Sequence, residues 1–435
     1  MNTGMSSARN KKARAALPAP GMRRLAKYLD KVWRFSKLVR TLKDGRKNPS
    51  APTAAVFLSL FGMLSVRLGS LNQLWTQFKI PGRWERWVGP IKPSADTIAY
   101  ALDRFNLKLL RAMLWAIAVL CKRKKIFRRL YPDTHWVAAL DGIETYKSRE
   151  KDDCEHCLSR RILVNDEYIT EYYHRYVVLQ MVGVTPAVFL DVEALQPGET
   201  EATAGMRLLE RFLKWHPRYL DAITMDAFYL QAPFVKKLLK YGLHLLIVLK
   251  QENRELYQDA VGLCASVPAK ITRVGTEEIK FWDLGAMQSW TQLEREVRVI
   301  RSTEKHLKGK KQKNGEWVYK EEIRDWLWCL ISPEGGEKPD GELSVKWGHA
   351  RWDEETRGFC ELTQHWHLDH CYRHNATAML AYLMILFMAF TLTTIFFQRN
   401  IKGIWKQMAR VTLSRLLMDD LILPYEGGFW LAAPA

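Results

Sequence analysis

The sequence contains neither a P-loop nor the glycine pattern of a dinucleotide-binding fold, so no nucleotide cofactor is implied. No internal repeat is visible, which argues against solenoid and propeller architectures. The first 20 residues are basic and polar and lack the apolar core of a secretory signal. With seven cysteines, an odd number, the chain is expected to keep reduced thiols in a cytoplasmic compartment.

Acidic residues are scarce relative to basic ones: 47 Asp and Glu stand against 66 Lys and Arg, a formal net charge of +19. This excess favours nucleic acid as the partner, because Lys and Arg neutralise phosphates. Residues 1–50 hold 14 Lys or Arg against two Asp. A second basic run comprises Lys305, Lys308, Lys310, Lys311 and Lys313. A solvated surface or a patch at a membrane surface is the alternative interpretation.

One long apolar run, residues 376–397, carries no charge over 22 residues, which is enough to span a bilayer. It follows a His-rich polar stretch, and no second convincing span accompanies it. We therefore expect a core helix packed on a sheet, and a membrane-associated protein is the alternative.

Hydrophobic periodicity divides the chain into six segments. They are a disordered basic tail (1–20), a helical DNA-binding region (21–132), the first part of an α/β core (133–250), a β-rich insertion (251–345), the helices that complete the core (346–400) and a C-terminal tail (401–435). In the second segment, Ser94 is expected to cap the helix that follows it.

The first part of the core alternates strand-like and helix-like runs. These are strands at 135–144, 168–182 and 187–193, a helix at 200–215, a strand at 220–226, a helix at 232–241 and a strand at 243–250. Three strands followed by helix, strand, helix and strand is the order of a ribonuclease-H-like core. The predicted fold class is α/β, with a mixed sheet flanked by helices and some buried parallel pairing.

Two aspartates each end an apolar, strand-like run: Asp141 ends VAALD and Asp226 ends AITMD. A carboxylate at the carboxyl end of a buried strand faces the crevice in which α/β sheets bind ligands. Carboxylates gathered there suit two Mg²⁺ ions, which stabilise charge in phosphodiester chemistry. Taken singly, such an Asp is more often a turn or helix-capping residue.

A third carboxylate is expected on the helix after the insertion, where Arg351 and Glu355 share one face by i, i+4 spacing. A surface salt bridge is the alternative interpretation of this pair. The rivals for the third position are Asp353, Glu354 and Glu361.

The segments VAALDGIETYKSR, AITMDAFYL and RWDEETRGFCEL resemble the three active-site blocks of DDE-type bacterial insertion-sequence transposases. They most resemble the group with a β-rich insertion before the glutamate-bearing helix. The resemblance implies that Asp141, Asp226 and Glu355 form a catalytic triad that binds two Mg²⁺ ions, or Mn²⁺ in their place. It also implies that Arg351 stabilises phosphate charge.

The implied activity is cut-and-paste transposition, that is, endonucleolytic strand cleavage and strand transfer at insertion-sequence ends. The implied partners are terminal inverted repeats, target DNA and a second copy of the chain in a homodimeric synaptic complex, with no membrane. The expected location is the bacterial cytoplasm, in association with the nucleoid. Contacts with DNA are expected from Arg351, Trp347, Trp352, Lys305, Lys308, Lys310 and Lys311.

Two positions depart from the family pattern: Gly348 stands where the family has a Tyr, and Leu362 stands where it has a Lys. In the family these side chains are associated with phosphate and DNA contacts near the cleaved end. A catalytically inactive, transposase-derived DNA-binding protein is therefore the alternative function.

Cys154 and Cys157 have the spacing of zinc ligands, with His174 downstream. A single CxxC motif is a weak signal, and we favour a reduced pair of thiols in a loop. A second group consists of His365, His367, His370, Cys371 and His374. Most of these lie along one side at helical spacing, which favours polar packing or DNA contact over a metal site.

The concentration of basic residues in 1–50 predicts that DNA binding weakens steeply with salt and that deleting this segment flattens the slope. Fluorescence anisotropy with labelled duplexes at several salt concentrations measures the slope. An unchanged slope in the truncated protein would assign DNA binding to other surfaces, such as 305–313.

Overall fold

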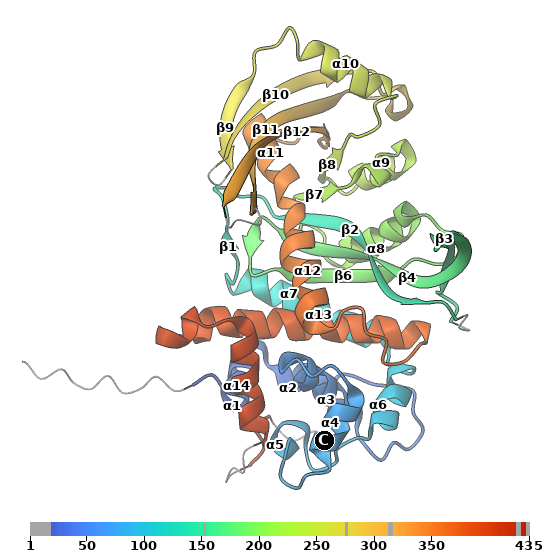
Figure 1. Ribbon diagram of the computed structural model, residues 1–435, viewed down its shortest axis with the longest axis vertical. Helices are drawn as coiled ribbons and strands as arrows, with labels where there is room; N and C mark the ends of the chain where they lie inside the picture. Colours follow the sequence, from blue (N-terminus) through green and yellow to red (C-terminus); the bar gives the residue numbers. More distant parts are fainter. Residues whose placement is uncertain (1–18, 151–153, 275–276, 312–315, 423–427, 432–435) are drawn as a thin grey trace, which may run out of the picture.

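The computed structural model describes residues 19–150, 154–274, 277–311, 316–422 and 428–431. The expected basic tail therefore lies almost wholly outside the described residues, as does part of the expected C-terminal tail. Figure 1 shows N-terminal helices at one end of the long axis, a central sheet, and the strands of residues 270–331 at the other end.

The elements follow the chain in four groups. The N-terminal helices are α1 (Met22–Trp33), α2 (Phe35–Arg40), α3 (Thr53–Ser65), α4 (Leu71–Phe78), α5 (Glu85–Val88), α6 (Ala95–Leu102) and α7 (Leu107–Arg123). The central elements are β1 (Arg128–Arg129), β2 (Val137–Ser148), β3 (Leu158–Val164), β4 (Glu167–Val182), β5 (Val184–Thr185), β6 (Val188–Ala194), α8 (Glu201–Trp215), β7 (Ala222–Met225), α9 (Ala232–Leu239) and β8 (His244–Val248). The insertion contains α10 (Glu255–Leu263), β9 (Lys270–Val274), β10 (Glu277–Met287), β11 (Val297–Lys311) and β12 (Trp317–Ile331). The last group is α11 (Gly341–Ala350), a π-helical segment (Glu354–Phe359), α12 (Cys360–Trp366), α13 (Ala376–Asn400) and α14 (Arg410–Ile422).

The N-terminal region is helical as predicted, and the Ser94 hydroxyl caps α6 by accepting a hydrogen bond from the Thr97 amide. The described part of the first basic segment, from residue 19 onward, packs into the protein. Met22, Leu25 and Leu29 of α1 are fully buried, and α1 packs against both α13 and α14. Deleting residues 1–50 would therefore remove part of the core, so the salt test needs a truncation that ends before α1.

The central sheet is mixed. Its strands lie in the order β6, β4, β2, β7 and β8, with β4 antiparallel to β2 and β6 and with β2, β7 and β8 parallel to one another. The α/β class with some parallel pairing is confirmed. Every side chain of the short strands β7 and β8 is buried. Both faces of these strands are therefore covered, as is usual for parallel strands.

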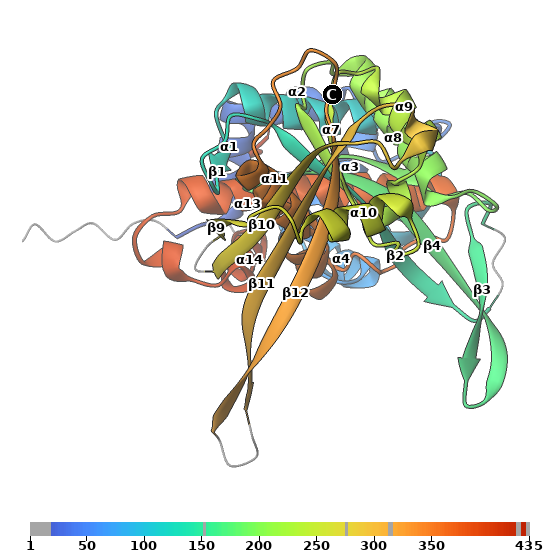
Figure 2. The same ribbon diagram turned by 90° about the horizontal axis from the view of Figure 1, so that it is seen from above.

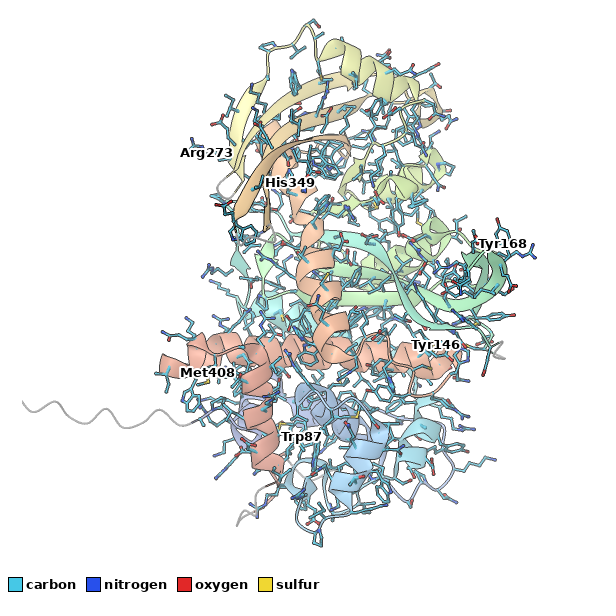
Figure 3. All side chains as sticks on the ribbon, in the orientation of Figure 1. Trp87, Tyr146, Tyr168, Arg273, His349 and Met408 are labelled. Carbon is cyan, nitrogen blue, oxygen red and sulfur yellow. The ribbon has the colours of Figure 1, made fainter. Side chains whose placement is uncertain are left out.

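The insertion continues the central sheet, because β12 pairs antiparallel with β8 and is followed by β11, β10 and β9. The second basic run of the sequence belongs to β11 as far as Lys311. Figure 2 shows the β11–β12 hairpin projecting well beyond the sheet, and the β3–β4 hairpin projects on the same side. Tyr168 lies near the outer end of the β3–β4 hairpin and is 69% exposed (Figure 3).

Among the described residues, α13 alone is long and apolar enough to cross a membrane, and its apolar window is wholly buried inside the protein. The expectation of a buried core helix agrees with the structure. The helix packs on the sheet as expected, but it also packs against other helices. Its partners are β6 and α7 on the side of the sheet and α3 and α6 on the other side, as Figure 1 shows. The Phe387 ring stacks on Phe189 of β6 at 4.1 Å, and Thr393 hydrogen-bonds Ser65 of α3 at 3.0 Å.

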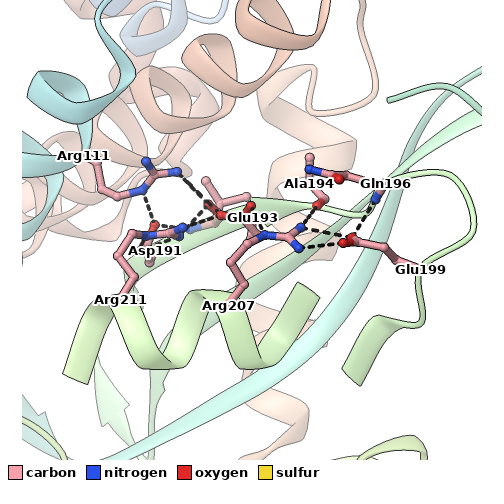
Figure 4. A network of polar contacts seen from close by, with 9 residues as sticks. Arg111, Asp191, Glu193, Ala194, Gln196, Glu199, Arg207 and Arg211 are labelled. Carbon is pink, nitrogen blue, oxygen red and sulfur yellow. Dashed lines mark hydrogen bonds and ion pairs between the residues drawn. The ribbon is translucent and has the colours of Figure 1, made fainter. Parts of the chain in front are cut away.

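An ion-pair network fastens α7 and α8 to β6 (Figure 4). Asp191 of β6 is fully buried and binds Arg111 of α7 at 2.9 Å and Arg211 of α8 at 3.1 Å. Arg207 of α8 binds Glu193 of β6 at 2.8 Å. Removing one partner from a buried pair typically costs about 3–5 kcal/mol, because the other charge is left uncompensated. The network therefore holds two helices in fixed positions on the sheet.

A charge in the middle of α13 should unfold the protein or nearly so. Leu386 is fully buried, and Leu386→Arg should lower the free energy of unfolding by about 4 kcal/mol or more. Urea titration followed by circular dichroism measures this loss. The control is Leu163→Arg on β3, where the leucine is 58% exposed, and its midpoint should barely move. Equal stability of the two variants would contradict the buried position of α13.

Candidate active site

Asp141 and Asp226 lie side by side. The parallel pairing of β2 with β7 ends at Leu140 and Met225, so the two aspartates are the next residues on adjacent strands. Neighbouring strands are about 4.8 Å apart, which brings the two carboxylates within reach of a shared ligand. Asp141 does not end its strand as expected, because β2 continues to Ser148 as the antiparallel partner of β4.

Each aspartate carries one basic partner and one backbone donor. Arg351 Nη1 lies 2.7 Å from Asp141 Oδ2, and Lys250 Nζ lies 3.1 Å from Asp226 Oδ1. The amides of Gly142 and Ala227 donate to the Oδ1 atoms of Asp141 and Asp226 at 2.8 and 2.7 Å. These contacts orient both carboxylates. They engage both oxygens of Asp141, whereas on Asp226 both contacts go to Oδ1 and leave Oδ2 for a further ligand.

Among the candidates for the third carboxylate, Glu354 is buried near Asp141. The Glu354 side chain is fully buried, and within the described residues neither of its carboxylate oxygens has a hydrogen-bond partner. Burial raises the pKa of Glu354 well above its usual value, and the negative charges of Asp141 and Glu201 raise it further against the effect of Arg351. Glu355 is exposed to solvent. Burial therefore favours Glu354, one of the rivals, over the predicted Glu355.

The local helix geometry explains this difference. The i, i+4 spacing of Arg351 and Glu355 assumes one regular α-helix, but Arg351 lies at a turn after α11 and Glu354–Phe359 is π-helical. The Glu354 amide donates to the Arg351 carbonyl at 3.1 Å, an i, i+3 bond. This turn is tighter than an α-helical turn, so Glu354 and not Glu355 lies on the side of Arg351. Single π-turns within α-helices occur frequently at functional sites.

The other rivals for the third position are engaged elsewhere. An Asp353 carboxylate oxygen accepts a hydrogen bond from the Gly183 amide at 3.1 Å, and the other oxygen pairs with Arg357 at 3.1 Å. Glu361 binds Arg67 of the N-terminal region at 3.1 Å. These two acids fasten the helix to its surroundings.

A fourth acid, Glu201 in the first turn of α8, was missed by the sequence analysis. A Cβ atom on Gly142 would lie 2.4 Å from Glu201 Oε2, so this carboxylate packs directly against the residue after Asp141. Glu201 accepts a hydrogen bond from the buried Tyr229 hydroxyl at 2.9 Å and one from Arg175 Nε at 2.7 Å. From sequence, Glu201 is indistinguishable from an ordinary first-turn acid that offsets the helix dipole.

The two aspartates differ in acidity. Burial raises the pKa of Asp141 above its usual range despite the opposing effects of Arg351 and the Gly142 amide. Burial acts in the same direction on Asp226, but the Ala227 amide and Lys250 hold the pKa of Asp226 below its usual range. The site thus combines one carboxyl group whose pKa is lowered with two, Asp141 and Glu354, whose pKa values are raised.

This set of side chains fits a divalent cation. Asp141, Asp226 and Glu354 offer only oxygen donors, the ligands that Mg²⁺ prefers. The two Glu354 oxygens are buried without a hydrogen-bond partner among the described residues, and such a carboxylate needs a proton or a cation to balance it. A metal ion that replaces that proton would supply the positive charge that the buried Glu354 carboxylate lacks.

The aromatic residues expected to contact DNA lie mostly in the interior. Trp347 is fully buried and donates from Nε1 to Asp133 at 2.9 Å, so it is a core residue. Trp352 is partly buried, with its ring perpendicular to that of Trp326 at 4.8 Å. Gly348 packs on Trp328: a Cβ atom there would lie 2.4 Å from the indole. A Tyr at this position could not be accommodated.

The remaining predicted contacts are only partly described. Leu362 is fully buried, so the position at which the family has a Lys faces the core here. Lys305 is exposed on β11 and pairs with Glu321 at 2.7 Å. The side chains of Lys308, Lys310 and Lys311 lie outside the described part of the structure, although their backbone belongs to β11.

Comparison of the chain with protein-family models and with curated proteins gives no match.

The acidity of Glu354 can be tested through stability. A carboxyl group with a raised folded-state pKa stabilises the protein fully below the unfolded pKa of about 4.3, and this contribution is lost as pH rises through the folded value. Glu354→Gln, which is neutral at every pH, should therefore be more stable than wild type above neutral pH in the presence of a chelator. Thermal melts from about pH 4 to pH 9 measure the difference.

The matched control is Glu355→Gln, which alters the exposed neighbour and should follow the wild-type curve at every pH. If Glu355→Gln shows the alkaline stabilisation and Glu354→Gln does not, Glu355 is the buried acid and the assignment fails.

Proposed function

We propose that this protein is a DDE-type DNA transposase that cleaves and joins DNA strands at insertion-sequence ends, with Asp141, Asp226 and Glu354 as its metal-binding triad. The observation that carries the proposal is the adjacency of two aspartates on parallel strands beside a buried glutamate with no hydrogen-bond partner among the described residues. Acids that raise one another's pKa values at one place are characteristic of functional sites.

The order of the strands supports a ribonuclease-H-like core. Strands β2, β4 and β6 form an antiparallel group, and β7 and β8 then add in parallel on the other side of β2. This is the arrangement expected from three strands followed by helix, strand, helix and strand. The acids lie where β2 and β7 separate, the position at which open α/β sheets bind ligands.

Two Mg²⁺ ions held by these carboxylates would supply the charge that activates a hydroxyl group and stabilises the leaving oxygen in phosphodiester cleavage. The protein contributes cations as well. Arg351 lies against Asp141 and Lys250 against Asp226, so both can turn toward a phosphate that enters between the aspartates. The Arg351 guanidinium, with its planar donors, suits bidentate phosphate contact. Glu201 and Tyr229 fix the packing behind Asp141.

The charge distribution supports DNA as the substrate. A groove of about 680 Å³ between the ends of α7 and α13 is lined by several basic residues. They are Lys125, Arg128, Arg399, Lys406 and Arg410. With the exposed Lys305 of β11, these side chains can neutralise phosphates of terminal inverted repeats or target DNA. A homodimeric synaptic complex is part of the same proposal.

Strand cleavage tests the proposal. Asp141→Asn, Asp226→Asn and Glu354→Gln should each lower Mg²⁺- or Mn²⁺-dependent nicking of supercoiled plasmid DNA by about 100-fold or more, because each removes a ligand charge. Binding of DNA, measured by anisotropy, should change little. Glu355→Gln is the matched control and should nick at the wild-type rate.

Full activity of Glu354→Gln would remove Glu354 from the triad. A wild-type protein that binds DNA but never nicks it with either metal would instead favour the non-catalytic DNA-binding derivative, to which the buried Leu362 and the tightly packed Gly348 also point.

A further inference from the structure

A second group of side chains with metal-binding chemistry is formed by Cys154, His174 and His374. The thiol sulfur and one ring nitrogen from each histidine all lie within 4.8 Å of one another. The Nε2 atoms of His174 and His374 are 2.8 Å apart although the residues are 200 positions apart in the chain. Contact between such distant segments reflects the tertiary fold and not local sequence.

The three residues come from three different segments. Cys154 begins the turn between β2 and β3, His174 lies on β4 opposite Thr145 of β2, and His374 lies in the loop between α12 and α13. This loop was expected to continue the helix, with the histidines along one side. Instead α12 ends at Trp366, and the bend brings His374 to the sheet.

The surroundings are aromatic and partly closed. His174 is 1% exposed, and its ring stacks on Tyr176 at 6.3 Å. The ring of Tyr146, which is labelled in Figure 3, lies 4.8 Å from that of His374. Cys154 and His374 are half-buried, so the three ligands lie at the margin of the interior.

The spacing suits zinc. With Zn–N bonds of about 2.0–2.1 Å and Zn–S bonds of about 2.3 Å, ligand atoms around a tetrahedral ion are about 3.3–3.7 Å apart. The three observed atoms need to move only by fractions of an ångström to about 1 Å to reach that geometry. Thiolate and imidazole are the ligands typical of Zn²⁺, whereas Mg²⁺ prefers oxygen.

We propose that Cys154, His174 and His374 bind a structural Zn²⁺ ion, with Cys157 as the fourth ligand. Cys157 lies on the same tight turn as Cys154, where its amide donates to the Cys154 carbonyl at 3.0 Å. A CxxC turn of this kind presents two sulfurs to one ion, and rotation of the Cys157 side chain completes a closed Cys₂His₂ set. The weak sequence signal at Cys154 and Cys157 thus gains its missing partners from the fold.

The zinc would clamp the β2–β3 turn and β4 to the loop that leads into α13. The same loop follows α12, which continues directly from the π-helical segment with Glu354. The site would therefore help to fix the helix that carries the third acid. This inference does not depend on the proposed transposase activity, because its ligands are separate from Asp141, Asp226 and Glu354.

Metal analysis of the purified full-length protein tests the inference. Wild type should retain about one equivalent of zinc after dialysis, and replacement by Co²⁺ should give the intense ligand-field bands of a tetrahedral site together with thiolate-to-cobalt charge transfer. Cys154→Ser and His374→Asn should each lose most of the zinc. Cys157→Ser should weaken binding and reduce the charge-transfer band by about half.

Two matched controls lie nearby in the sequence. Cys360→Ser alters an exposed thiol, and His370→Asn alters a histidine of the same loop that lies against Tyr372. Both should keep the full zinc content and the cobalt spectrum. A strong chelator should lower the melting temperature of wild type and of both controls, because it removes their zinc. It should leave the melting temperature of His374→Asn unchanged, because that variant has already lost most of its zinc.

Wild type without zinc, and without a tetrahedral cobalt spectrum after Co²⁺ addition, would overturn the inference. Full zinc content in a folded Cys154→Ser or His374→Asn protein would do the same. A cobalt spectrum unchanged by Cys157→Ser would remove Cys157 from the ligand set. None of these results depends on strand cleavage, so they are separable from a failure of the proposed function.

Discussion

The enclosure of α13 is the constraint on which the rest of the structure depends. A helix without a charged residue along most of its length must be covered on every side, and two layers of protein cover this one. β6 contacts it from the sheet, and α3, α6 and α7 contact it from the N-terminal region. The larger hydrophobic core consequently contains residues from near both ends of the chain, Met22 and Leu431, and a second, smaller core joins the sheet to α11. The basic N-terminal helices are therefore part of the body that carries the acids.

The candidate site follows from that arrangement. The Asp191 network holds α7 and α8 against β6, and the first turn of α8 in turn places Glu201 against Gly142. On the other side, the π-helical segment places Glu354 in the interior near Asp141. Several acids are thus held together by packing on three sides, although their mutual repulsion disfavours ionisation. Arg351 and Lys250 offset part of this repulsion.

The insertion affects the site through the helix that follows it. Because β12 pairs with β8, the central sheet extends without a break, and α11 packs on the extension. Trp328 of β12 fills the space beside Gly348, so a small residue is required where the resembling family has a Tyr. The buried Leu362 belongs to the core for a similar reason. Both departures from the family pattern are consequences of how this chain packs.

The sequence by itself determined the α/β class, the five central strands, the capping of α6, the burial of α13 and the positions of Asp141 and Asp226. Period, turn residues and strand ends are local signals, and each can be recognised without knowing its neighbours. Only the tertiary structure distinguished the buried Glu354 from the exposed Glu355, because a tight turn at Arg351 interrupts the regular α-helical spacing. It likewise decided the proximity of Glu201 to Asp141 and of Cys154 to His374. Such contacts join segments far apart in the chain, and residue spacing carries no information about them.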